Sequence, residues 1–207
     1  MNKSNISAVV FDLGGVLIDI DYQRTIDAFT AIGVENASNL YNQFDQNMFF
    51  DQYEKGEISS EKFISKLEIL TQRNIEKESI VRAWNEMIGL FPEEKLAFIH
   101  KIQSKIPCYL LSNTNELHLK KVYANAYSAF ESLFQKCYYS HVIGKRKPDV
   151  ETFQWLVDQI KFKASEILFI DDSPQHIEGA ERAGLQTIYY QDEKDLYSIE
   201  NRIRSSE

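Results

Sequence analysis

The chain has 207 residues and a formal net charge of -8, and this charge argues against nucleic acid or an anionic membrane as its main partner. Its length suffices for one well-buried domain with a sizeable insertion, or for two small domains. No apolar run approaches the length of a membrane span, and the N-terminus lacks a secretory pattern. We interpret the two cysteines, Cys108 and Cys137, as free thiols of a reducing compartment. We therefore expect a cytoplasmic protein that binds neither nucleic acid nor membrane.

The first predicted element is a strand of apolar residues at positions 8–11, which ends on Asp12 and is followed by Gly14 and Gly15. Continuous apolar runs are typical of parallel strands that are covered on both faces. Open α/β sheets bind ligands just beyond the carboxyl ends of their strands, and glycines let the backbone come close to a ligand. Asp12 is therefore predicted to act on a ligand, rather than only to cap a turn.

A long interval of helical pattern follows this strand. Between residues 19 and 90, apolar residues recur at helical spacing, in groups that include Ile26 and Phe29, Phe63 and Leu67, and Ile80 and Trp84. Gly33 is expected to end the first helix, and Ser59 to cap the helix that carries Phe63. Pro92 is expected in the first turn of the next helix. The interval is thus predicted to be a small helical bundle inserted after the first strand.

Strands and helices alternate in the rest of the chain. Predicted strands begin at Cys108, Cys137, Ile167 and Thr187, with helical patterns between them. Such alternation implies the α/β class, with a parallel sheet that carries helices on both faces. The residues after Asp192 are predicted to form a surface helix that frays.

Polar motifs stand at three strand ends and in one loop. Besides Asp12, they are Ser112-Asn113, Asp171-Asp172 and a loop with Lys147. Ser112 and Asn113 are also common turn residues, and Lys147 has basic neighbours that suggest a solvated cluster. Any one motif is weak by itself, but the four in this order form a strong joint signal.

Together the four motifs predict a metal-assisted phosphate site. Asp12 and Asp172 offer the hard oxygen ligands that Mg²⁺ prefers. Ser112 and nearby backbone amides can donate hydrogen bonds to phosphoryl oxygens, and Lys147 supplies a positive charge to the same oxygens. One carboxylate would then be free to attack phosphorus. No spacing of His and Cys suggests zinc.

The arrangement resembles the haloacid dehalogenase-like hydrolase superfamily across nearly the whole chain. Its nucleophilic Asp is matched by Asp12, its Ser or Thr by Ser112, its Lys by Lys147, and its acidic pair by Asp171-Asp172. The amino-acid sequences of residues 11–17 and 112–115 are most similar to those of the branch that includes α-glucose-1-phosphate phosphatases. The phosphatase half of soluble epoxide hydrolases is similar but less close.

The resemblance implies a fold and a division of the chain. Residues 1–18 and 91–207 would form a Rossmann-like α/β hydrolase core. Residues 19–90 would be a helical cap domain of the first cap class of this superfamily. Within the cap, residues before Gly56 are expected to face the site, although aromatic residues at helical spacing are more often packing residues; these candidates are Phe49, Phe50, Tyr53 and Glu54. Arg146 is a further candidate for substrate choice.

The resemblance also implies the roles of the site residues. Asp12, the Gly14 carbonyl and Asp172 would hold Mg²⁺, and Asp171 would stand behind them without touching the metal. Ser112, Asn113 and Lys147 would hold the phosphoryl oxygens of a small phosphorylated metabolite, such as a sugar phosphate. Asp12 and Lys147 would be the catalytic residues. Neither the particular metabolite nor the oligomeric state can be read from the sequence.

One position departs from the pattern of the family. Most of its phosphatases carry an Asp two residues after the nucleophile as general acid and base, and this chain has Gly14. Proton transfer to the leaving oxygen is worth about 10²–10⁴-fold in rate, and Asp19 or Asp21 are the nearby carboxylates that could replace it. Two alternatives therefore stay open, a metal-independent dehalogenase and a phosphate-binding protein without turnover. The intact acidic pair favours phosphate chemistry over dehalogenation.

Overall fold

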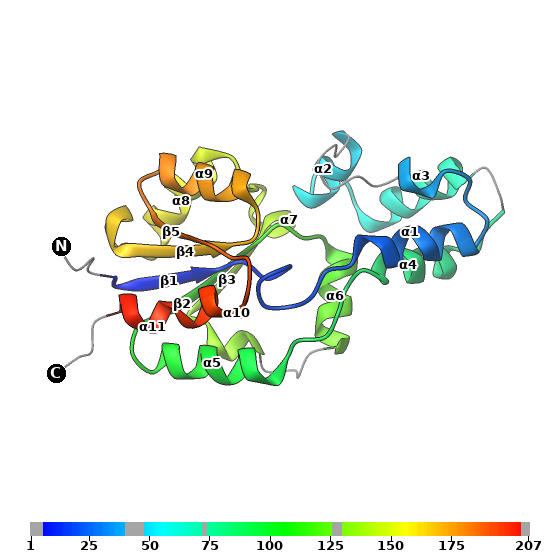
Figure 1. Ribbon diagram of the computed structural model, residues 1–207. Helices are drawn as coiled ribbons and strands as arrows, with labels where there is room; N and C mark the ends of the chain where they lie inside the picture. The colour runs from blue at the N-terminus through cyan, green and yellow to red at the C-terminus, as the bar shows by residue number, and fades with distance from the viewer. Residues whose placement is uncertain (1–5, 40–47, 72–73, 126–129, 204–207) are drawn as a thin grey trace.

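The computed structural model describes residues 6–39, 48–71, 74–125 and 130–203. A parallel sheet of five strands lies at its centre, in the order β3-β2-β1-β4-β5 (Figure 1). The strands are β1 (Ala8–Phe11), β2 (Cys108–Ser112), β3 (Lys136–Tyr139), β4 (Ile167–Asp171) and β5 (Gln186–Tyr189). The strand that carries the first polar motif is thus the central one.

The strand order places the polar motifs at one edge of the sheet. β1 pairs with β2 on one side and with β4 on the other, so that Phe11 lies opposite both Leu110 and Ile170. All three strands run in the same direction, and their carboxyl ends therefore meet. Ligands of doubly wound sheets bind in the crevice at such a point, where the chain leaves the central strand in opposite directions.

Helices cover both faces of the sheet, as the alternation of strands and helices predicts (Figure 1). On one face, Val9 and Phe11 of β1 pack with α5 (Glu93–Gln103), α10 (Glu193–Tyr197) and α11 (Ile199–Arg202). On the other face, Ala8 and Val10 pack with α8 (Val150–Ile160) and α9 (Pro174–Arg182). The predicted α/β fold is confirmed.

Two local predictions are wrong. Residues 193–203 do not form a single surface helix that frays: α10 begins with a capping box of Asp192 and Asp195, and Leu196 and Ile199 are fully buried. Apolar residues that are scattered in a polar tail give no periodic signal, although they suffice to anchor two short helices to the core. Pro92 precedes α5 as its N-cap and does not lie in the first turn.

The interval between β1 and α5 is helical, as predicted, and extends beyond the carboxyl edge of the sheet (Figure 1). It contains α1 (Tyr22–Ala31), α2 (Met48–Glu54), α3 (Ser60–Thr71) and α4 (Lys77–Asn85). Gly33 follows α1 with a φ of 90°, and the Ser59 hydroxyl accepts a hydrogen bond from the Lys62 N–H at 3.3 Å. Gly33 at the end of α1 and Ser59 at the start of α3 thus have the roles that the sequence predicts.

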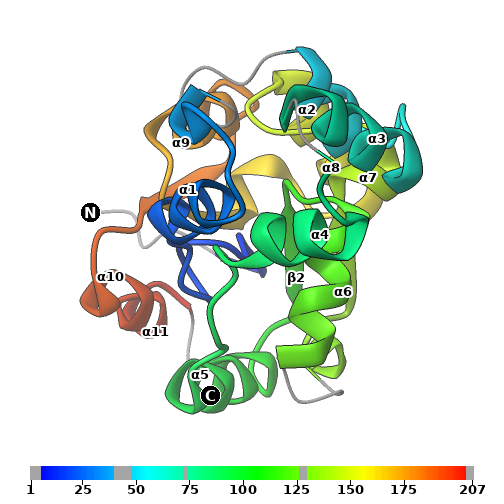
Figure 2. The ribbon, with the colours of Figure 1, turned by 90° about the vertical axis from the view of Figure 1, so that its right-hand side faces the viewer.

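The helical interval joins the core through two adjacent connections. Ile20 on the way out and Ile88 on the way back form an antiparallel bridge, and the Gly89 N–H donates to the Asp19 carbonyl at 2.9 Å. Figure 2 shows α1 and α4 side by side, and the Thr25 hydroxyl links them by donating to the Trp84 carbonyl at 3.3 Å. The division at residues 19 and 90 stays a prediction that this paired crossing supports.

The remaining described elements are α6 (Glu116–Asn125), α7 (Ser140–Ile143) and the 3-10 segments Phe130–Leu133 and Ala164–Glu166 in the core, and the 3-10 segment Ala37–Asn39 in the helical interval. Among the described residues, no helix is long and apolar enough to cross a membrane. The cytoplasmic location stays a prediction.

Candidate active site

A cavity of about 650 Å³ lies where the carboxyl edge of the sheet meets the helical interval. All four polar motifs contribute to its wall, through Asp12, Ser112, Asn113, Lys147 and Asp172. Asp171 stands behind this wall, fully buried. The topology thus brings the residues of the four polar motifs together at one place.

Lys147 is the central charge of the site. Its side chain is fully buried, and Nζ lies 2.7 Å from Asp12 Oδ1 and 2.6 Å from Asp171 Oδ2. Burial alone would lower the pKa of Lys147, but the two carboxylates raise it above its ordinary value. Lys147 therefore stays charged, and it is no member of a solvated basic cluster.

The two carboxylates beside Lys147 differ in their titration. Burial raises the pKa of Asp12 to about 8, although the Lys147 charge opposes this rise. Burial would raise the pKa of Asp171 as well, but Lys147 and His176 hold it below its ordinary value. A nearby positive charge favours the ionised form of a carboxyl group and lowers its pKa. A cation bound beside Asp12 would therefore offset the rise in pKa that burial causes.

The acidic cluster fits a divalent cation. Oxygen atoms of Asp12, Asp171 and Asp172 lie within 4.8 Å of one another. Both oxygens of Asp171 already have partners, since Oδ2 contacts Lys147, and Oδ1 accepts from the Ser173 N–H at 2.8 Å and lies 2.9 Å from His176 Nδ1. Mg²⁺ prefers one or two carboxylates together with water and phosphate oxygens. The cluster fits this preference, and the assignment of Asp12 and Asp172 as the ligands stays a prediction.

The glycines after Asp12 have separate structural reasons. Gly15 has a φ of +80°, and a Cβ there would lie 2.1 Å from Asp172 Oδ2. At Gly14 a Cβ would lie 3.0 Å from the Ile20 side chain, which occupies part of the space that a carboxyl at position 14 would need. The role of the Gly14 carbonyl as a metal ligand stays a prediction.

Asn113 is placed differently from a simple phosphate ligand. Its side chain donates to the Lys147 carbonyl at 2.8 Å and accepts from the Lys147 N–H at 2.9 Å. This pair of bonds fixes the loop that carries Lys147 against the end of β2. The phosphate contact of Asn113 stays a prediction, and so does that of Ser112, which is 3% exposed at the cavity wall.

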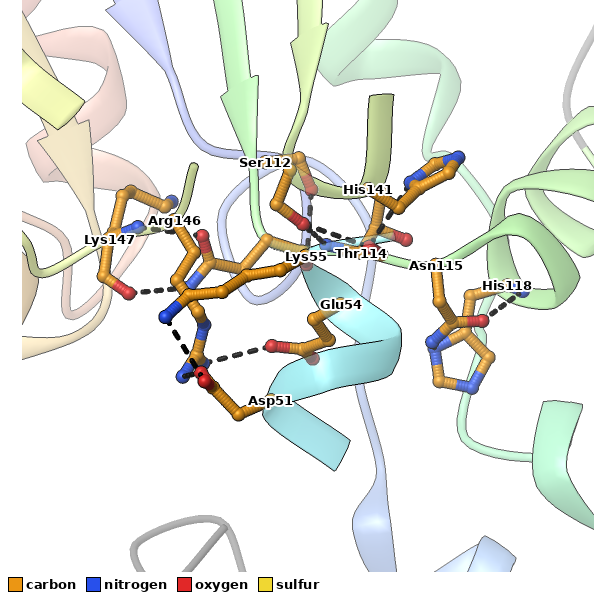
Figure 3. Close-up of polar contacts among 12 residues, drawn as sticks. Asp51, Glu54, Lys55, Ser112, Thr114, Asn115, His118, His141, Arg146 and Lys147 are labelled. Atoms are coloured by element: carbon orange, nitrogen blue, oxygen red, sulfur yellow. Dashed lines mark hydrogen bonds and ion pairs between the residues drawn. The ribbon is translucent and has the colours of Figure 1, made fainter. Parts of the chain in front are cut away.

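Two histidine contacts near the site could not be read from the sequence. His176 holds Asp171, as described above. His118 stacks on Trp84 with ring centroids 4.7 Å apart, and its Nε2 lies 3.1 Å from the Trp84 carbonyl. The Asn115 side chain accepts from the His118 N–H at 3.0 Å and so caps α6 (Figure 3). The sequence signal for the cap is an Asn three residues before a His at the start of a helix. This signal does not indicate that the His packs on Trp84 of α4.

The residues that the sequence placed before Gly56 divide into two groups. The aromatic residues pack within the helical interval itself. The ring of Phe63 stacks on those of Phe49 and Tyr53, with centroid distances of 5.0 and 4.0 Å. Phe50 stacks on Trp84 at 5.6 Å. Their prediction as site-facing residues is therefore not supported by their packing, and helical spacing alone could not separate the two faces. Only Glu54 of this group lines the cavity.

α2 meets the core at Arg146, beside Lys147. Arg146 Nη1 lies 2.7 Å from Asp51 Oδ1, and Nη2 lies 2.9 Å from Glu54 Oε2 (Figure 3). The approach is close because Gly56, with a φ of +69°, has no Cβ; one would lie 2.1 Å from the His141 carbonyl oxygen. The helical interval is thereby fixed over the cavity.

Known proteins resemble this chain over most of its length. Residues 6–184 match the haloacid dehalogenase-like hydrolase family. A D-ribitol-5-phosphate phosphatase of Bacteroides thetaiotaomicron is 30% identical over 189 residues, which are 88% of this chain and 90% of that protein. A sesquiterpene phosphatase of Aspergillus oryzae is 22% identical over 194 residues, 91% of this chain and 92% of that protein.

Solved structures give the same result. An enzyme of this family from Bacteroides thetaiotaomicron, in complex with magnesium and inorganic phosphate, superposes with a TM-score of 0.88 at 31% identity, covering 93% of this chain and 99% of that one. An L-2-haloacid dehalogenase superposes with a TM-score of 0.60 at 16% identity, covering 88% of this chain and 85% of that one; it shares the fold. The resemblance drawn from the sequence motifs is confirmed.

Proposed function

The chain belongs to the haloacid dehalogenase-like hydrolase family and is a phosphatase of it, and from that premise we propose that it hydrolyses a small sugar or polyol phosphate with Asp12 as nucleophile. The observation that carries the proposal is the buried Lys147, which bridges Asp12 and Asp171 at the wall of a polar cavity. A buried ammonium between carboxylates is costly to assemble. Its position suits the binding of phosphoryl oxygens.

In the proposed reaction, the Asp12 carboxylate attacks phosphorus while the bond from phosphorus to the leaving oxygen breaks. The products are an aspartyl-phosphate and the alcohol, whose leaving oxygen takes its proton from water because position 14 supplies no acid. Water then attacks phosphorus and gives a proton to the solvent, the bond between phosphorus and Asp12 breaks, and phosphate is released with Asp12 restored. Lys147 neutralises charge on the phosphoryl oxygens, and the Ser112 hydroxyl donates to them. Asp12, Asp172 and the Gly14 carbonyl would hold Mg²⁺, which would supply further positive charge and so favour the ionised form of Asp12.

One relative and the size of the cavity support the proposed substrate class. The bacterial relative acts on D-ribitol 5-phosphate by its name, and a cavity of about 650 Å³ is within the usual range for small ligands. The helical interval of residues 19–90 would act as a cap that excludes water from the reacting phosphoryl group. Because Gly14 supplies no acid, we expect phosphates with good leaving groups, such as anomeric and aryl phosphates, to react as well.

The test is phosphate release from three compounds, with Mg²⁺ and with a chelator. D-ribitol 5-phosphate, α-D-glucose 1-phosphate and para-nitrophenyl phosphate are compared for the wild type, Asp12→Asn and the control Asp158→Asn, which changes an exposed carboxylate of α8. We expect Mg²⁺-dependent release by the wild type and the control, and none by Asp12→Asn. Release that persists in the chelator, or that survives Asp12→Asn, would overturn the proposal. Halide release from a 2-haloacid without metal would favour a dehalogenase instead.

A further inference from the structure

Asp51 and Glu54 of α2 both form ion pairs with the guanidinium of Arg146, which lines the cavity. Arg146 contacts Asp51 and Glu54 through different nitrogens, at 2.7 and 2.9 Å. The two acidic side chains are not equivalent, however. Glu54 is 13% exposed and lines the cavity, whereas Asp51 is 29% exposed, contacts Lys55 as well, and lies outside the cavity wall. Figure 3 shows both acidic side chains reaching toward Arg146 from the same helix.

The charges around Arg146 decide what kind of ligand can lie there. One guanidinium faces two carboxylates, so this part of the wall is not an anion site, although it adjoins Lys147. An ionised carboxylate is an acceptor only, with about four lone-pair sites on its two oxygens, and one Arg146 nitrogen contacts a single oxygen of Glu54. Glu54 therefore retains acceptor capacity toward the cavity.

Hydroxyl groups match this acceptor. They donate hydrogen bonds and carry no charge, and polyols and open-chain sugars present several of them to the Glu54 oxygen that does not contact Arg146. A carboxylate at the same end of the substrate would meet Glu54 with like charge, and an alkyl chain would leave Glu54 partly desolvated without a donor. Sites built to bind hydroxyl groups reject analogues that lack them for this reason.

We propose that Glu54 is a specificity-determining residue, whose carboxylate accepts hydrogen bonds from hydroxyl groups of the substrate beyond its phosphate, with Arg146 holding it in place. The inference rests on the proposed phosphatase activity and names the group that selects polyol or sugar phosphates. Asp51 provides a matched control, because it holds the same guanidinium from the same helix without reaching the cavity.

The experiment compares three substrates with the same primary phosphate ester: D-ribitol 5-phosphate, n-pentyl phosphate, which lacks the hydroxyls, and D-ribonate 5-phosphate, which carries a terminal carboxylate. The kcat/KM values are measured with Mg²⁺ for the wild type, Glu54→Gln and Asp51→Asn. We expect Glu54→Gln to reduce the preference for ribitol phosphate over pentyl phosphate by about 10- to 100-fold, mainly through KM. Asp51→Asn should change both substrates alike and leave their ratio within about threefold.

Each further outcome bears on the inference separately. A preference that is unchanged in Glu54→Gln, or equally reduced in Asp51→Asn, would overturn it, because the pair would then only fix the helical interval over the core. The wild type itself should prefer ribitol phosphate over ribonate phosphate by at least about tenfold, a result that does not depend on the folding of any variant; equal values would overturn the inference. If the wild type hydrolyses the alkyl and polyol esters equally well, only this inference fails, whereas no release from any ester overturns the proposed function.

Discussion

Lys147 and Asp171 form an ion pair that is shielded from solvent, with Nζ 2.6 Å from Oδ2 and neither side chain exposed. The same ammonium reaches Asp12 at 2.7 Å, so that one buried cation serves two carboxylates from neighbouring strands. Removing it would leave both carboxylates uncompensated. The pair thus links the folding of the core to the assembly of the candidate site.

The substitution Lys147→Met tests this link. It keeps much of the side-chain volume and removes the charge, and we expect the free energy of unfolding to fall by about 3–5 kcal/mol because a buried ion pair loses one partner. Phosphate release should be lost as well. The control is Lys163→Met, whose side chain is 81% exposed and whose loss should cost less than about 1 kcal/mol. Equal unfolding free energies for the two variants in urea would contradict the account.

Gly15→Ala separates backbone strain from a steric clash. The new Cβ would lie 2.1 Å from Asp172 Oδ2 at a φ of +80°, whereas Gly144 has a similar φ of +66° with no atom within 4 Å of its Cβ position. Gly15→Ala and Gly144→Ala should each lower the unfolding free energy by about 1–2 kcal/mol, because each places a Cβ on a left-handed backbone conformation. Only Gly15→Ala should also displace Asp172 and weaken Mg²⁺ binding and phosphate release. Titration calorimetry with Mg²⁺ checks this, and equal affinities for both variants would refute it.

The metal prediction can be tested without substrate. A ligand that binds only the folded state at 100 times its Kd raises the unfolding free energy by about 2.7 kcal/mol. We expect Mg²⁺ to raise the Tm of the wild type and of Asp158→Asn, and to leave the Tm of Asp172→Asn unchanged. A full Mg²⁺-induced rise in Asp172→Asn would show that Asp172 is no ligand.

His118 makes stability depend on pH. Burial lowers its pKa to about 4, with the Trp84 carbonyl opposing the shift, whereas an unfolded chain has a His pKa near about 6.5. Between these values the unfolded state binds more protons, so that stability falls as the pH falls from about 6.5 to about 4, by about 3 kcal/mol in total. We expect His118→Gln to remove this part of the pH dependence. Unfolding curves of equal pH slope for wild type and variant over this range would contradict the assignment.

Much of the fold could be predicted from the sequence because its signals are local. Continuous apolar runs that end on Asp12 and Asp171 mark buried parallel strands, and parallel strands bring their carboxyl ends to one edge of a sheet. The cap prediction rested on the lack of a strand pattern between residues 19 and 90. These are properties of short segments, which need no knowledge of their partners.

The errors and omissions concern contacts between distant segments. Helical spacing groups the aromatic residues around Phe63, yet it does not say which helix face meets the core, so that Glu54 could not be separated from Tyr53. The contact of the Asn113 side chain with the backbone of Lys147, 34 residues away, could not be read from the sequence. Leu196 and Ile199, which are buried near the C-terminus, lie in helices too short to show the repeated apolar spacing of a longer helix.

The most direct test of the central claim is to trap the phosphoryl group on Asp12. The wild type is mixed with para-nitrophenyl phosphate and Mg²⁺, quenched with acid during turnover, and treated with borohydride, which reduces an aspartyl-phosphate to homoserine. Mass spectrometry of the peptide with residue 12 should show homoserine there, dependent on both substrate and Mg²⁺. Phosphate release with residue 12 unmodified, together with undiminished release by Asp12→Asn, would contradict the account.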